Sequence, residues 1–108
     1  MKVDCEELYR ALIRVHNEVE FELSKRNWKT PVPVPWEYVR ELVEEGLRLI
    51  QEIESRCTDI PYYVVSEKRW LLWRREVVEE ELRELEEMRR EFSRLFTRRS
   101  EADGDRAP

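Results

Sequence analysis

The sequence predicts an all-α protein, built either as a three-helix bundle or as a helical hairpin plus one long C-terminal helix with coiled-coil character. Charged residues make up 42% of the 108-residue chain and hydrophobic residues 41%, with only two glycines. Such a mixture is typical of long helices and coiled coils. Hydrophobic residues also recur at three- and four-residue spacing in three stretches that are separated by prolines. We therefore expect a single helical domain over residues 1–99, followed by a disordered tail over residues 100–108 (SEADGDRAP).

The first helix is predicted over about residues 5–25. Asp4 is placed to cap its N-terminus, and Glu7 three residues later completes a capping-box pattern. One face of this helix is apolar and consists of Cys5, Leu8, Leu12, Val15, Val19 and Leu23. Phe21 lies off that face, so we expect it to be exposed or to meet a second surface.

The segment from residue 26 to 35 (RNWKTPVPVP) interrupts the helical pattern, because alternating prolines favour extended backbone. Proline-rich ligands of recognition domains have this composition, and so do stiff connectors between packed helices. The connector interpretation suits so short a chain better, because interhelical links of this length are common.

The second helix is predicted over about residues 36–57, and its apolar face has the spacing of coiled-coil core positions. This face consists of Trp36, Val39, Val43, Gly46, Ile50, Ile53 and Cys57. A glycine within a helix costs about 1 kcal/mol relative to alanine. Gly46 therefore indicates that another helix comes close at this point.

The third helix is predicted over about residues 67–99, with Ser66 as its N-cap and residues 58–65 (TDIPYYVV) as a loop. This loop allows the helix to turn back along the second helix, which is the simpler arrangement, or to start from its other end. Within the third helix Leu71, Val78, Leu85 and Phe92 recur at seven-residue spacing. Its length of roughly 50 Å exceeds the roughly 32 Å of each other helix, which predicts an overhang of about 18 Å.

Hydrophobic residues on this overhang form the predicted interface, which consists of Leu85, Met88, Phe92, Leu95 and Phe96. So much apolar surface calls for a partner, either a second copy of the chain or another helical protein. A parallel homodimer would stack the acidic stretch 79–87 on itself and the basic stretch 89–99 on itself. An antiparallel homodimer centred near Met88 would instead place each basic end beside the acidic stretch of the other chain. We therefore expect an interaction or assembly module that forms an antiparallel homodimer.

The basic end of the third helix also allows a different function, that of an accessory nucleic-acid-binding protein. Its five arginines could bind phosphates, and they are Arg89, Arg90, Arg94, Arg98 and Arg99. Two structural explanations compete with this function, because cations stabilise helix C-termini and because these arginines can pair with the preceding glutamates. The net charge of −5 also favours the structural explanations.

The two cysteines, Cys5 and Cys57, should meet if the first two helices pack antiparallel, since each lies on an apolar face at the same end of the pair. They could form a disulfide or remain as two buried thiols. Intracellular disulfides occur mainly in hyperthermophiles. The abundance of Glu and Arg, with one Gln and two Asn in the whole chain, suggests such a source.

Motifs for catalysis, metal binding or cofactor binding are not apparent, so we expect a protein that is not an enzyme and carries no cofactor. His16 is the single histidine, and Glu20 is its nearest carboxylate in sequence. A structural role suits it better than a catalytic role, which would require a nucleophile or further ligands. Without a signal peptide or a long apolar run, the chain is expected to be cytoplasmic and not to bind membranes.

Overall fold

A computed structural model describes residues 4–25 and 33–104, with side chains described as far as Thr97. Three helices lie within these ranges: α1 (Cys5–Ser24), α2 (Trp36–Arg56) and α3 (Tyr62–Gly104). The predicted all-α, three-helix fold is thereby confirmed, whereas the coiled-coil character stays a prediction. Most of the proline-rich connector lies outside the described residues, and of its described part Val34 is buried.

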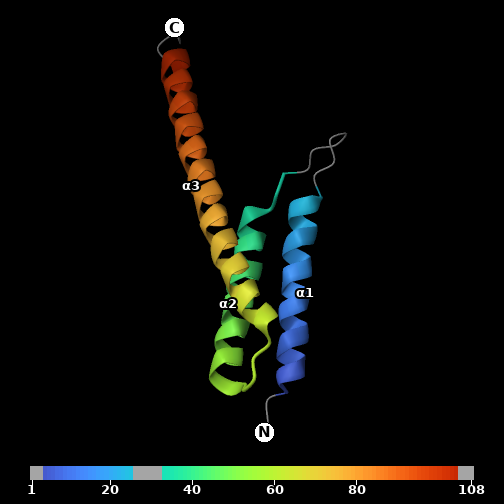
Figure 1. The fold of residues 1–108 in the computed structure, drawn as a ribbon. Coiled ribbons are helices and arrows are strands. Elements are labelled where there is room, and N and C mark those ends of the chain that lie inside the picture. The colour runs from blue at the N-terminus through green and yellow to red at the C-terminus, as the bar shows by residue number, and fades with distance from the viewer. Residues whose placement is uncertain (1–3, 26–32, 105–108) are drawn as a thin grey trace.

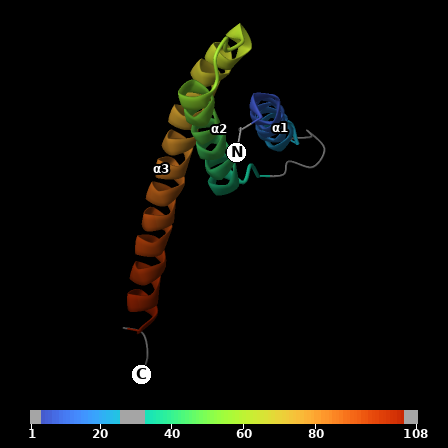
Figure 2. The ribbon, with the colours of Figure 1, turned by 90° about the horizontal axis from the view of Figure 1, so that it is seen from below.

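The helices run up, down and up again, so that α3 turns back along α2 (Figure 1). Seen from below, α2 lies between α1 and α3 (Figure 2), and the extensive helix contacts are those of α2 with each neighbour. The molecule measures 76 × 33 × 23 Å. This elongated shape arises because α3 continues far beyond the point where α2 begins.

The first helix begins as the sequence predicts, since the Asp4 carboxylate accepts a hydrogen bond from the backbone N–H of Glu6 at 3.0 Å. Its apolar face contributes Leu8, Leu12 and Val19 to the core. Phe21 lies on the exposed side, where the Lys25 ammonium sits 4.8 Å from the ring centroid. The apolar periodicity of α1 therefore identified the buried face correctly.

Gly46 lies at the point where all three helices come together. A Cβ atom added there would be 2.8 Å from Cδ1 of Leu71 on α3 and 3.2 Å from Cγ1 of Val15 on α1. Leu71 is fully buried, so its side chain has little room to move away. The close approach that Gly46 indicates in the sequence is thus present on two sides of α2.

Gly46→Leu is expected to destabilise the fold by roughly 1–3 kcal/mol, because overpacking outweighs the better helix propensity of leucine. Urea unfolding of the variant and the wild type measures the difference. A higher unfolding midpoint for the variant would show that the space beside Gly46 can be filled.

The start of α3 differs from the sequence prediction, since the helix begins at Tyr62 rather than at residue 67 and Ser66 is not its cap. The turn after α2 contains Asp59, whose φ of 52° is a conformation that aspartate tolerates. The backbone N–H of Val64 then donates to the Pro61 carbonyl at 3.1 Å. Burial of Val64 in the core overrides the β propensity of the segment Tyr62–Val65.

The end of α3 also differs, because the helix continues past the predicted end at residue 99 to Gly104. The first part of the predicted disordered tail is therefore helical. Residues 105–108 lie outside the described residues.

Candidate functional site

The heptad stripe of α3 passes from the core of the bundle onto a surface that the rest of the chain does not cover. Val64, Leu71 and Val78 occupy this stripe beside α2, and each is at most 2% exposed. One heptad further Leu85 is 42% exposed, and Phe92 is 69% exposed. The change occurs where α2 begins, so the same face of α3 is buried along α2 and uncovered beyond it (Figure 1).

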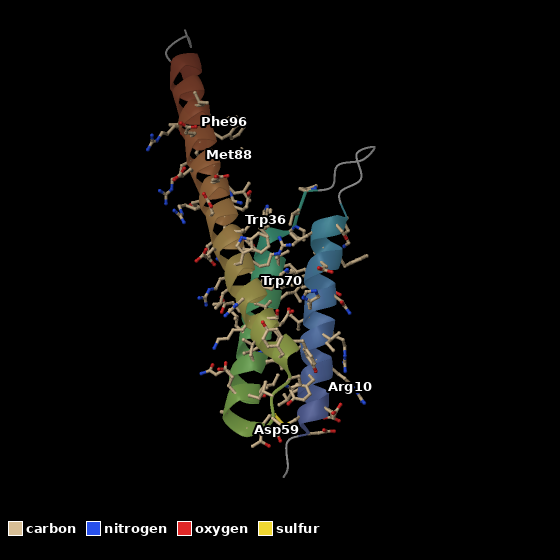
Figure 3. The ribbon with its side chains drawn as sticks, in the orientation of Figure 1. Arg10, Trp36, Asp59, Trp70, Met88 and Phe96 are labelled. Carbon is tan, nitrogen blue, oxygen red and sulfur yellow. A yellow bond between two sulfur atoms is a disulfide. The ribbon has the colours of Figure 1, made fainter. Side chains whose placement is uncertain are left out.

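We call the uncovered part the exposed stripe, and it consists of Leu85, Met88, Phe92, Leu95 and Phe96. These are the residues that the sequence predicts as an interface, and the last four are each at least 63% exposed. The Phe92 and Phe96 rings stack with centroids 6.4 Å apart. Figure 3 shows Met88 and Phe96 on α3 well past Trp36, which marks the start of α2. A contiguous apolar surface of this kind is typical of an interaction site.

Charge changes sign along the overhang, as the sequence predicts. The acidic stretch 79–87 begins beside α2, where Arg40 lies 3.9 Å from Glu79, and continues onto the overhang, where Arg90 lies 3.6 Å from Glu86. Arg89 and Arg94 are exposed, whereas the side chains of Arg98 and Arg99 lie outside the described residues.

A cleft of about 540 Å³, which we call the notch, opens where the start of α2 meets α3. Trp36 of α2 and Leu82 and Leu85 of α3 supply its apolar lining. Its charged lining comprises three carboxylates and one guanidinium, those of Glu37, Glu41, Glu86 and Arg89. The notch is therefore an apolar depression with a net negative rim, next to the exposed stripe.

Tyr38 also lines the notch, and its hydroxyl donates a hydrogen bond to Glu18 of α1 at 3.2 Å. Desolvation, together with this hydrogen bond, raises the pKa of Tyr38 above its ordinary value. The hydroxyl thus remains a neutral donor that links α1 to the first turn of α2.

His16 links α1 to the first turns of α3. Its Nδ1 lies 2.8 Å from Oε1 of Glu67, and its Nε2 lies 3.4 Å from Oε1 of Glu20. Its ring also packs against Trp70 at a centroid distance of 4.2 Å. Glu20 was predictable from its position one turn away, but Glu67 is 51 residues distant and gave no signal in the sequence. These contacts suit a structural role that holds α3 against α1.

Arg74 stacks on two tryptophans of α3, with its guanidinium carbon 5.0 Å from the Trp70 ring centroid and 4.4 Å from that of Trp73. Its buried Nε has no hydrogen-bond partner. The stacking covers apolar ring surface near α1, far along α3 from the exposed stripe.

Cys5 and Cys57 form a disulfide, with Cα atoms 6.1 Å apart and a sequence separation of 52 residues. The bond ties the first residue of α1 to the residue that follows α2. It therefore fixes the end of the bundle opposite to the overhang (Figure 1).

Within residues 4–25 and 33–104, no group of three or more His, Cys, Asp or Glu side chains is arranged to hold a metal ion. Nor is any helix in these ranges both long and apolar enough to cross a bilayer. Comparisons of the chain with models of protein families, with curated proteins and with solved structures gave no significant match.

Proposed function

We propose that this protein is a non-enzymatic assembly module in which two copies pair through the exposed stripe of α3. The observation that carries the proposal is the continuity of the heptad stripe, which is buried as far as Val78 and then exposed from Leu85 onward. A helix face that is already suited to packing against α2 is suited to packing against another helix. A second copy supplies such a helix with the same apolar spacing.

Charge favours the antiparallel orientation of the two copies. With α3 of both chains antiparallel, Met88 packs beside Phe92 of the partner subunit, and Leu85 packs beside Leu95 of the partner subunit. This register pairs four of the five residues of the exposed stripe with apolar residues, and it places Phe96 opposite Glu84. It also brings the basic end of each helix toward the acidic stretch of the other, which the parallel orientation does not.

Apolar burial supplies most of the affinity in this arrangement, because fully burying a Leu, Met or Phe side chain is worth about 1.5–3 kcal/mol. Surface ion pairs contribute about 0–1 kcal/mol each and mainly select the orientation. Association also costs free energy in lost translational and rotational freedom. Several apolar side chains per subunit are needed to offset that cost, and the exposed stripe provides them.

The competing proposal, an accessory nucleic-acid-binding protein, rests on the exposure of Arg89, Arg90 and Arg94. Glu84, Glu87 and Glu91 line the same surface cleft as Arg90 and Arg94, and these carboxylates would repel phosphates. Phosphate binding would also leave the exposed stripe, which is apolar, without a role. Self-association therefore accounts for more of this surface.

Hydrogen exchange of the wild-type protein tests whether the exposed stripe is covered in solution. A single helix without packing is marginally stable in water, so an uncovered overhang should exchange its amide hydrogens rapidly. At tens of micromolar we expect slow exchange across residues 83–97, with faster exchange on dilution, while the exchange of α1 stays unchanged. Fast exchange of residues 83–97 at the highest concentration would argue against any cover over the stripe.

A further inference from the structure

We propose that the notch at the start of α2 receives Phe96 and the adjoining basic turn of α3 from a second copy of the chain. The notch thereby adds Trp36, Glu37 and Glu41 of α2 to an interface that otherwise consists of α3 alone. This inference rests on the proposed self-association and specifies its geometry.

The lining of the notch suits an aromatic side chain. Trp36 is partly exposed, and with Leu82 and Leu85 it forms an apolar surface that opens directly onto the exposed stripe. The volume of about 540 Å³ leaves ample room for a phenyl ring and part of the helix that carries it. Aromatic residues that enter such depressions commonly anchor protein interfaces.

The register of the antiparallel pair brings the required side chain to this place. When Met88 lies beside Phe92 of the partner subunit, Phe96 of the partner subunit lies at the level of Glu84, between Leu82 and Leu85. Leu82 lines the notch and is itself partly buried against the core. The apolar surface of the bundle, the notch and the exposed stripe then form one continuous interface.

Charge complementarity identifies the occupant as the end of α3 from a second copy. The rim of the notch carries three carboxylates against one guanidinium. Arg98 and Arg99 follow Phe96 within one helical turn in the sequence, so the same segment that supplies the ring also supplies two cations. In a parallel pair this segment would lie at the far end of the assembly from the notch of the other chain.

Two charge-reversed variants test the contact between notch and basic turn. The first combines Glu37→Lys with Glu41→Lys, and the second combines Arg98→Glu with Arg99→Glu. Glu37 and Glu41 are exposed, so the first variant should fold, and circular dichroism checks both. A homodimer of either variant has two equivalent contacts between a notch and the end of α3 from the other subunit. In both contacts the two surfaces would carry charge of the same sign, and the repulsion is strongest at low salt. We expect each homodimer to weaken by roughly tenfold.

Mixing the two variants should restore the affinity of the wild type, because both notches of the mixed dimer would then face a segment of opposite charge. Sedimentation velocity with a fluorescent label on one variant measures this mixed species. Two results would overturn the contact between notch and basic turn while leaving self-association in place. In one, each variant dimerises as tightly as the wild type. In the other, both variants dimerise weakly and mixing them does not restore the affinity. A monomeric wild type would instead overturn the self-association on which the inference rests.

Discussion

Replacing both Phe92 and Leu95 with glutamate is expected to convert the proposed dimer into a folded monomer. Both side chains are at least 65% exposed in the single chain, so neither change removes core packing. In the proposed dimer both are buried on both subunits, and the variant would bury four carboxylates in an apolar seam. Because apolar burial is lost and charge must be desolvated, dimerisation should weaken by more than roughly a hundredfold.

Sedimentation equilibrium of the variant measures its mass, and circular dichroism measures its helix content. A matched control is Ile13→Glu with Phe21→Glu, which places the same charges on exposed apolar residues of α1. We expect the control to dimerise as the wild type does. If the α3 variant were also dimeric, the exposed stripe could not be the interface.

Removal of the disulfide is expected to cause a larger loss of stability than the Gly46→Leu substitution. The bond spans a sequence separation of 52 residues, which corresponds to about 4 kcal/mol in the chain-entropy description of disulfide stabilisation. Small domains have limited cores, so this contribution is a large fraction of their total stability. We therefore expect Cys5→Ser with Cys57→Ser to lower the urea midpoint strongly.

The stability of the protein with and without the disulfide can also be compared by adding reductant to the wild type. Addition of reductant should lower the midpoint of the wild type and leave that of the double-serine variant unchanged. Intact mass after alkylation under denaturing conditions reports the thiols directly. Two alkylated cysteines in the wild type without reductant would contradict the presence of the bond in solution.

The sequence could predict the parts of the fold that depend on local pattern. Apolar spacing located the core faces of α1 and α2, and Gly46 marked the close approach of Leu71 and Val15. The greater length of the third helix predicted an overhang, and its apolar residues are indeed exposed. These predictions succeeded because helical periodicity and helix length both depend on residues that are close together in the sequence.

Features that depend on tertiary packing could not be predicted in the same way. Val64 and Val65 favour strands locally, but contact of Val64 with the core makes their segment the start of α3. Glu67 becomes the partner of His16 only because α3 turns back beside α1. The notch likewise joins Trp36 to Leu82, and their proximity follows from the antiparallel packing of α2 and α3.

Sedimentation equilibrium of the wild-type protein tests most directly whether a second copy covers the exposed stripe. At tens of micromolar and in moderate salt, we expect twice the chain mass of 13.3 kDa. Added salt should shift this mass little, because apolar contacts supply most of the affinity. A mass of one chain under these conditions would contradict self-association and would assign the exposed stripe to the helix of a different protein.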